Sequence, residues 1–312
     1  SADHGFTDVQ GFDIGPDGTF YIGAITRDGG RVNNIARGVL DAATGARTWT
    51  VIARTEPIPP GTKNHPHPGI VLSPDGRFVF LNSGSRTDHG EAAPATGYPE
   101  GTREVPLSAS ILRVPADGEG IVIPADEKEL RASGYKFADG FRNAFDMRFA
   151  PNGDLFAGDN GPDSDLPDAL MWVRQGHHFG FPWRMGGIDN PQTFAGYDPA
   201  VDNYILFTRS SARSDGLFHD DPTFPPAPMV FSDPVINLGP DADRFRDPVT
   251  GDAVDASDAG LTVKTFTPHS SPLGIVFDED RAMAGEFKGA GFLLRTGGDC
   301  CNLIGSFNDP DE

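Results

Sequence analysis

Short apolar segments that flank Pro-Asp-Gly or Pro-Asn-Gly recur along this chain. Each copy has an apolar run, the three-residue turn and a second apolar run. The copies are 11–22, 69–80 and 146–157, with turns at Pro16-Asp17-Gly18, Pro74-Asp75-Gly76 and Pro151-Asn152-Gly153. Because these turn residues suit a tight connection between antiparallel strands, each copy predicts a β-hairpin.

A fourth copy has a degenerate turn at Asp278-Glu279-Asp280, and we expect its first strand, 274–277, to pair with 291–294. Four further segments are apolar or alternate like strands: 48–53, 110–114, 120–123 and 261–266. The 39 glycines and 28 prolines are spread along the chain, and no long helical pattern interrupts them. Many short strands joined by tight turns require this composition.

Repeated hairpins indicate units stacked radially or linearly. Dividing 312 residues by a blade of roughly 50 gives about six units. We therefore predict an all-β, six-bladed β-propeller with long decorating loops, formed by a single domain over residues 1–312. The insert 186–234, which is rich in Asp, Pro and aromatic residues, is expected to form long loops over one face and a candidate substrate lid. A β-sandwich would not explain the repeated hairpin.

The chain is strongly acidic, with a formal net charge of −20 and no stripe of Lys and Arg. This excludes a nucleic-acid partner, because phosphate binding needs clustered cations. No segment approaches the roughly 20 apolar residues of a membrane span. An Asp-rich, Lys-poor chain that starts without Met is typical of a processed exported protein, so we expect a periplasmic or extracellular location.

The two cysteines, Cys300 and Cys301, are neighbours, so no disulfide can join distant parts of the chain. They form either two free thiols or a strained vicinal disulfide, and the sequence leaves both open. The acidic run 241–258 is better explained as a solvated loop than as a calcium site.

Polar turns flank the third hairpin on both sides. Arg142 and Asn143 precede it, Asp159-Asn160-Gly161-Pro162 follows it, and an aromatic corner at 179–183 comes next. An Arg, an Asn and several carbonyl and carboxylate oxygens would project from the same end of one sheet. That grouping suits an anionic ligand held beside a hard cation.

Several motifs, in order, resemble those of the soluble glucose/sorbosone dehydrogenase family over roughly residues 60 to 295. They are Asn64-His65 before Pro74-Asp75-Gly76, 110–114 with Asp117-Gly118, Arg142-Asn143, Gly161-Pro162, 179–182 and 269–274. The ordered set is more specific than any one motif. The resemblance implies a six-bladed propeller that uses pyrroloquinoline quinone (PQQ) and calcium. It also implies oxidation of an aldose or related polyol, with electrons passed to an external acceptor.

The resemblance also implies roles for single residues. His65 would be the general base, and Arg142 would lie against the quinone oxygen and stabilise the charge that develops there. Asn143 and Asn160 would orient the bound groups, and the carbonyls of Gly161 and Pro162 would hold calcium near Asp165. His269 would lie at the channel mouth, and Arg295 or Lys288 would bind the PQQ carboxylates.

The chain departs from the family pattern at Phe181, where the family usually has Trp, and in two further places. Pro66-His67-Pro68 follows His65 where the family has small residues and then Gly-Arg-Leu, and Leu166-Pro167 follows Asp165 where the family has Asp-Glu. Two alternatives therefore stay open. One is a metal-dependent hydrolase such as a lactonase, and the other is a non-catalytic propeller that binds a carbohydrate or a protein.

Three alternatives concern single residues. His65, His67, Asp88, His89 and Glu91 could form a transition-metal site. His65 and His67 could simply cap a strand, and Arg142 could form an ion pair with Asp159.

Overall fold

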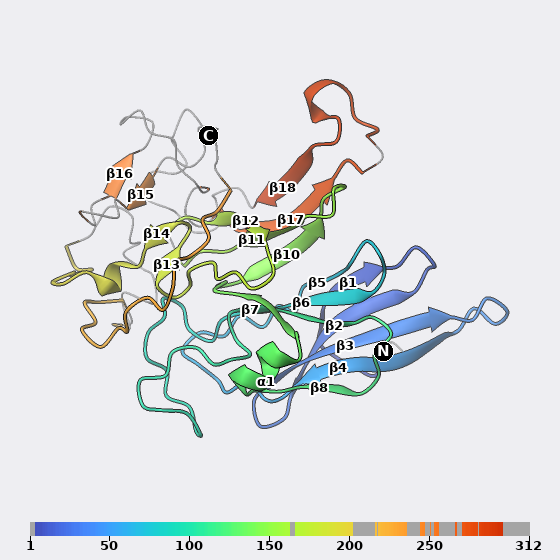
Figure 1. The fold of residues 1–312 in the computed structure, drawn as a ribbon, viewed down its shortest axis with the longest axis horizontal. Coiled ribbons are helices and arrows are strands. Elements are labelled where there is room, and N and C mark those ends of the chain that lie inside the picture. Colours follow the sequence, from blue (N-terminus) through green and yellow to red (C-terminus); the bar gives the residue numbers. More distant parts are fainter. Residues whose placement is uncertain are drawn as a thin grey trace.

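The structure, a computed structural model, describes residues 4–162, 166–201, 216, 218–235, 244–246, 250, 253–255, 266, 270–279 and 281–295. This part of the chain is mostly β (Figure 1). Its one α-helix, α1 (Glu127–Ala132), has six residues, and the 3-10 helices η1 (Pro191–Thr193) and η2 (Gly285–Phe287) are single turns. Within the described ranges, no helix has the length and apolar character needed to cross a membrane.

Three larger sheets follow one another along the chain. The first contains β1 (Val9–Ile14), β2 (Phe20–Arg27), β3 (Arg31–Leu40) and β4 (Arg47–Thr55), with β8 (Ile121–Ile123) added parallel to β4. The second has the order β5 (Ile70–Leu72), β6 (Phe78–Ser83), β7 (Ser110–Pro115) and β9 (Lys136–Asp139). The third has the order β10 (Ala144–Phe149), β11 (Leu155–Asp159) and β12 (Ala169–Val173).

Three two-stranded sheets complete the described strands. They are β13 (Arg184–Met185) with β14 (Ile188–Asp189), β15 (Arg244–Arg246) with β16 (Ala253–Asp255), and β17 (Pro272–Phe277) with β18 (Gly291–Arg295). The strand candidates 48–53, 110–114 and 120–123 fall in β4, β7 and β8, whereas 261–265 lies outside the described residues.

The four expected hairpins are present as antiparallel pairs, β1 with β2, β5 with β6, β10 with β11 and β17 with β18. The turn aspartates close the first two. Asp17 Oδ1 accepts a hydrogen bond from the Thr19 N–H at 3.0 Å, and Asp75 Oδ1 accepts one from the Arg77 N–H at 3.1 Å. The prediction of repeated hairpins from the turn residues is confirmed.

Each sheet packs on the next through its first hairpin. β5 contacts β1 and β2, β10 contacts β5 and β6, and β17 contacts β10 and β11. Figure 1 shows this succession as blue, cyan, green and red strands. The described residues show neither a closed ring nor a count of six blades, so the six-bladed propeller remains a prediction.

Glycines let the first hairpins of neighbouring sheets approach closely. A Cβ on Gly23 would lie 2.3 Å from the Pro68 carbonyl oxygen, and one on Gly69 would lie 2.4 Å from the Phe145 carbonyl oxygen. Real Cβ atoms do not approach oxygen this closely, so any larger residue would push the sheets apart. Apolar clusters fill the space beyond these contacts, one of them around Leu81 and Leu112 and another around Phe141 and Phe179.

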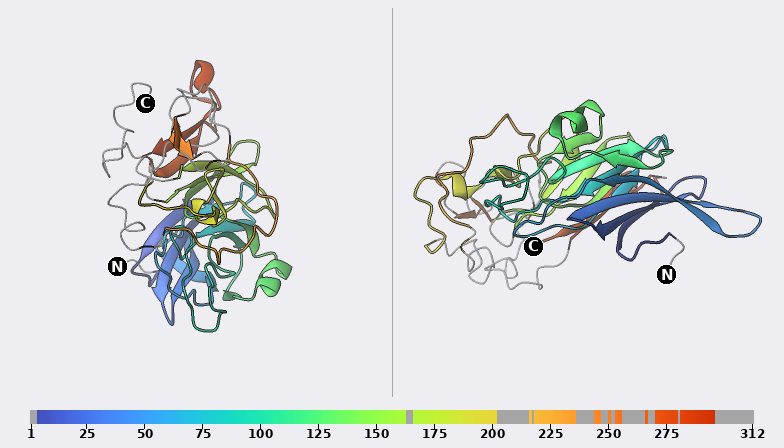
Figure 2. Two further views of the ribbon diagram at one scale, coloured as in Figure 1. Left: turned by 90° about the vertical axis from the view of Figure 1, so that its left-hand side faces the viewer. Right: turned by 90° about the horizontal axis from the view of Figure 1, so that it is seen from below.

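The hairpin turns and the long loops lie at opposite ends of the strands. The blue strands of the first sheet and the yellow segment around β13 and β14 are far apart in Figure 1 and in the right-hand view of Figure 2. The described parts of the insert, 186–201 and 218–235, contain only β14 and η1 as regular elements, as expected for long loops. The end of the sheets near this insert carries the candidate site.

Candidate functional site

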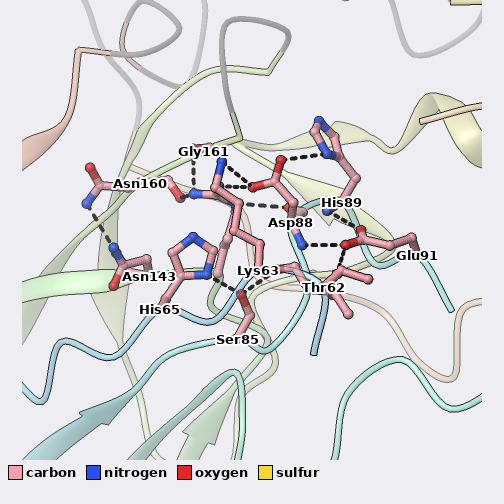
Figure 3. Close-up of polar contacts among 12 residues, drawn as sticks. Thr62, Lys63, His65, Ser85, Asp88, His89, Glu91, Asn143, Asn160 and Gly161 are labelled. Atoms are coloured by element: carbon pink, nitrogen blue, oxygen red, sulfur yellow. Dashed lines mark hydrogen bonds and ion pairs between the residues drawn. The ribbon is translucent and has the colours of Figure 1, made fainter. Parts of the chain in front are cut away.

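The site is built from residues at the open end of each hairpin. His65 precedes β5 and Ser85 follows β6, while Arg142 precedes β10 and Asn160 follows β11. The start of the first strand and the end of the second lie at the same edge of a hairpin, opposite its turn. Figure 3 shows the resulting group of polar side chains.

His65 is buried and its tautomer follows from its neighbour. Its Nδ1 lies 2.8 Å from Ser85 Oγ, and the Ser85 hydroxyl donates to the Thr87 carbonyl at 2.8 Å. A hydroxyl has one proton, so toward His65 it accepts, and Nδ1 carries the ring proton. Nε2 then holds a lone pair, and we find no hydrogen bond to it within the described part of the chain.

The surroundings of His65 keep it neutral. Burial lowers the pKa of His65 well below its usual 6.5, and the nearby Arg142 guanidinium lowers this pKa further. Asp88 opposes the shift without overcoming it. A neutral imidazole with a free lone pair on Nε2 is a proton acceptor near pH 7.

The Arg142 guanidinium is held by four acceptors. Its Nη2 forms a buried ion pair with the Asp88 carboxylate, and its Nε donates to the Asp88 carbonyl at 2.9 Å. Its Nη1 donates to the carbonyls of Asn160 at 3.0 Å and Gly161 at 2.7 Å. The cation is therefore fixed in place. Among the described residues its ion-pair partner is Asp88, and the alternative pair with Asp159 does not form.

Asp88 was not singled out as the partner of Arg142 by the sequence, yet it is the centre of the charged group. Burial alone would raise its pKa, but Arg142, His89 and Lys63 hold the pKa of Asp88 well below its usual range. Lys63 Nζ lies 3.3 Å from Asp88 Oδ1, and the Glu91 carboxylate accepts from the N–H groups of Asp88 and His89 at 3.0 and 2.8 Å. An ionised Asp88 thus neutralises part of a cationic cluster.

Asp159 joins the two polar turns. Its carboxyl oxygens accept from the N–H groups of Asn143 at 2.7 Å and Arg142 at 3.2 Å, and burial raises the pKa of Asp159 to about 7. Asn160 reinforces the link, because its N–H and its side-chain amide both donate to the Asn143 carbonyl at 3.1 and 3.2 Å. The structure thus brings Arg142, Asn143, Asn160 and Gly161 together.

The two carbonyls expected to hold calcium differ in their environment. The Gly161 carbonyl accepts from Arg142, whereas the buried Pro162 carbonyl accepts no hydrogen bond that we find among the described residues. Asp168 fixes this turn by accepting from the Gly161 N–H at 2.6 Å. Asp165 lies outside the described residues.

The last described hairpin reaches the same end. Asp168 also accepts from the Ser271 N–H at 2.6 Å and the Ser270 hydroxyl at 3.2 Å, and Arg295 Nη1 lies 3.3 Å from Ser270 Oγ. Arg295 is therefore connected to the Gly161 turn through two side chains. Lys288, at the C-cap of η2, lies in the β17–β18 connection and not at this end. His269 lies outside the described residues.

The alternative transition-metal cluster does not form among the residues that the structure describes. No group of three or more His, Cys, Asp or Glu there is placed to hold a metal ion. His67 instead contacts Gln10 Oε1 at 3.3 Å and the Phe145 ring at 5.1 Å, while His89 packs on the Phe218 ring at 4.3 Å. His67 thus lies apart from the others, whereas His89 Nδ1 stays 3.0 Å from Asp88 Oδ2.

Comparisons with known proteins give structural matches only. No family model matches this sequence, and no curated protein matches it. The soluble aldose sugar dehydrogenase from Escherichia coli, in its apo-form, matches with a TM-score of 0.40 and 21% identity over 59% of this chain and 49% of that protein. This chain thus spans about half the length of that protein.

Two further matches are PQQ-containing structures. The PQQ-bound aldose sugar dehydrogenase from Streptomyces coelicolor has a TM-score of 0.36 and 20% identity, over 60% of this chain and 50% of that protein. The holo form of the pyranose dehydrogenase PQQ domain from Coprinopsis cinerea has a TM-score of 0.43 and 14% identity, over 88% of this chain and 69% of that domain. Matches of this strength assign no role to any residue.

Proposed function

We propose that this chain is a PQQ- and calcium-dependent oxidoreductase that oxidises an aldose or related sugar or polyol on a six-bladed propeller. One observation carries the proposal. The buried His65 imidazole, whose Nδ1 lies 2.8 Å from Ser85 Oγ, belongs to the same polar group as Arg142, because the Ser85 N–H donates to the Arg142 backbone carbonyl at 2.8 Å. A base and a cation placed together suit a reaction in which a hydroxyl loses its proton while negative charge develops nearby.

In this proposal His65 Nε2 takes the proton from the hydroxyl of the carbon that is oxidised. Ser85 accepts from Nδ1–H and so keeps the lone pair on Nε2. Arg142 presents its guanidinium to the negative charge that develops on the acceptor. Bound PQQ would supply the two-electron acceptor for the hydride, and bound calcium would polarise it.

Two cations of the site, Arg142 and Lys63, could meet an anionic cofactor, and both contact the Asp88 carboxylate. The Glu91 and Asp168 carboxylates offset their charge, and burial raises the pKa of Asp159 to about 7. The side-chain amides of Asn143 and Asn160 add hydrogen-bonding groups at the same edge. This donor set fits the carboxylates and quinone oxygens of PQQ.

The oxygens of the turn fit calcium in part. The Pro162 carbonyl accepts no hydrogen bond among the described residues, whereas the Gly161 carbonyl would have to serve both calcium and Arg142. A carbonyl oxygen has two lone pairs, so sharing is chemically allowed. Calcium takes six to eight oxygen ligands, so we propose that Pro162, Gly161 and Asp165 contribute alongside the cofactor. In this proposal His269 and Arg295 complete the cofactor pocket. The enzyme would be periplasmic or extracellular and would pass its electrons to an external acceptor.

Titration of the purified protein with calcium and PQQ, followed by addition of a panel of aldoses, tests this function. The expected result is tight PQQ binding and bleaching of the quinone absorbance when the right sugar is added. His65→Ala should bind PQQ and lose sugar-dependent bleaching. His67→Ala is the matched control, because His67 lies in the same segment but contacts Gln10 and Phe145 instead. Absence of PQQ binding, or unchanged turnover in His65→Ala, would contradict the proposal.

A further inference from the structure

A cavity of about 510 Å³ lies on the insert, outside the polar group just described. Its walls combine three aromatic rings and three carboxylates, from Trp183, Phe224, Phe231, Asp189, Asp220 and Asp221. This volume falls within the range of small-molecule pockets, roughly 300 to 1,000 Å³. None of the described lining residues is Lys or Arg, so the cavity disfavours an anion.

The aromatic wall is held in place by specific contacts. The rings of Trp183 and Phe231 are near parallel, with an interplanar angle of 25° and centroids 6.0 Å apart, and Phe224 meets Trp183 edge-on at 80°. The indole N–H of Trp183 donates to the Pro225 carbonyl at 2.7 Å. With its one donor used, Trp183 offers the cavity a flat apolar surface.

The carboxylates supply acceptors in fixed positions. Asp221 is buried and forms an ion pair with Arg103 at 2.7 Å, and the Arg103 guanidinium also lies 4.2 Å from the centroid of the Phe224 ring. Asp220 Oδ2 accepts from the Gly196 N–H at 3.0 Å. Asp221 also accepts from the Thr223 N–H and hydroxyl at 2.9 and 2.6 Å. A carboxylate has about four lone-pair sites, so the acceptor capacity left for a ligand is mainly that of Asp220.

The insert is anchored to the loop that carries the charged group. The side-chain amides of Asn190 and Gln192 both donate to the His89 carbonyl at 2.7 Å. His89 directly follows Asp88, the counterion of Arg142. Hydrogen bonds thus connect the segment that carries the cavity wall to the loop that carries Asp88.

We propose that this cavity is a subsite for the non-reacting units of a neutral oligosaccharide whose terminal sugar is oxidised at the site around His65. Flat apolar rings match the C–H faces of a pyranose, and carboxylates accept hydrogen bonds from its hydroxyl groups. The inference rests on the proposed function, and it names the substrate class: a neutral oligosaccharide and not a free monosaccharide.

Binding to the cofactor-free protein tests the subsite without relying on turnover. Cellotriose and maltotriose, one β-linked and one α-linked, would be titrated by calorimetry and by tryptophan fluorescence, with glucose as the monosaccharide reference. At least one trisaccharide should bind at least ten-fold more tightly than glucose. Phe231→Ala and Asp220→Asn should each weaken that binding five-fold or more, with melting curves showing that both variants fold.

Matched controls lie elsewhere on the surface. Phe12→Ala removes an aromatic ring that is 68% exposed on β1, and Asp117→Asn removes an exposed carboxylate, so neither should change trisaccharide affinity. With PQQ and calcium, kcat/KM for the trisaccharide should exceed that for glucose ten-fold. The two cavity variants should lose this advantage and keep the value for glucose.

The possible failures are distinguishable. Turnover of glucose with no trisaccharide binding would overturn the subsite and leave the proposed function standing. Trisaccharide binding that depends on Phe231, in a protein that oxidises no sugar, would support the subsite and contradict the proposed function. Trisaccharide binding that neither cavity variant weakens would overturn the inference.

Discussion

The Nδ1 atom of His65 lies 2.8 Å from the hydroxyl oxygen of Ser85, whose own proton is given to the Thr87 carbonyl. Ser85→Ala would leave the Nδ1–H of a buried imidazole without its acceptor. We expect kcat/KM to fall roughly 10- to 100-fold, the usual cost of losing a group that orients a functional histidine. Steady-state kinetics with the substrate identified by the aldose panel measures this.

The tautomer itself can be observed without turnover. In the wild type, ¹⁵N chemical shifts of the imidazole should report a proton on Nδ1, and Ser85→Ala should show a mixture of tautomers. Ser85→Thr retains the hydroxyl and should recover most of the lost activity. A proton on Nε2 in the wild-type protein would contradict the assigned roles of Ser85 and His65.

The low pKa of His65 has consequences for the pH dependence of both activity and stability. Since burial and Arg142 lower this pKa well below 6.5, the acid limb of kcat/KM that belongs to His65 should lie well below pH 6.5. For stability, the unfolded chain binds a proton below pH 6.5 that folded His65 does not bind. The free energy of unfolding should therefore decrease as pH falls below 6.5, by up to about 1.4 kcal/mol per pH unit.

Comparison with His65→Gln isolates this contribution, because other titrating groups are common to both proteins. Urea unfolding at several values between pH 5 and pH 7.5 should show the variant gaining stability relative to the wild type as pH decreases. A constant difference across this range would mean that His65 is not held neutral.

Much of the site could be predicted from the hairpins. The turn residues located the hairpins of β5–β6 and β10–β11, and the open ends of those hairpins place His65, Arg142 and Asn160 at one edge. This worked because hairpin geometry is local. Both the turn type and the alternation of apolar residues are fixed by neighbours in sequence.

Other parts of the site depend on distant contacts that no local pattern records. Asp88 pairs with Arg142 across 54 positions, and it comes from a long loop, 84–109, that has no periodicity. From the sequence, the nearer Asp159 was the carboxylate named as the alternative ion-pair partner of Arg142. The sequence pointed to Asp88 only as a candidate ligand of the alternative transition-metal site, beside His89 and Glu91.

The buried ion pair of Arg142 with Asp88 should be sensitive to neutralisation. Asp88 is 1% exposed and Arg142 4%, so Asp88→Asn removes a buried negative charge that pairs with a buried guanidinium. Removing one member of a buried pair costs roughly 3 to 5 kcal/mol. We expect about 3 kcal/mol, because Arg142 keeps its bonds to three carbonyls, and chemical denaturation measures it.

An exposed pair provides the matched control. Arg77 and Asp75 lie 4.0 Å apart with side chains 73% and 54% exposed, and the third hairpin has Asn152 at the position of Asp75. Asp75→Asn should therefore cost less than about 1 kcal/mol. Equal losses for the two substitutions would show that Asp88 has no special role in stability.

The close approach of neighbouring sheets can be tested at equivalent positions of two hairpins. Gly69 and Gly274 occupy the same place in their repeats, but a Cβ on Gly69 would lie 2.4 Å from the Phe145 carbonyl oxygen, while one on Gly274 would first meet Leu294 Cβ at 3.5 Å. Gly69→Ala should lower the free energy of unfolding by roughly 2 kcal/mol or more, because backbone must move to relieve the overlap.

Gly274→Ala makes an ordinary van der Waals contact in a strand, so it should change stability by less than about 0.5 kcal/mol. Urea unfolding of both variants measures the difference. Gly69 lies four residues after His65, and Phe145 lies two residues after Asn143. Backbone movement at this contact should therefore displace site residues, so Gly69→Ala should also weaken PQQ binding while Gly274→Ala leaves it unchanged. Equal tolerance of both substitutions would show that the sheets are not packed as closely as the Gly69 contact requires.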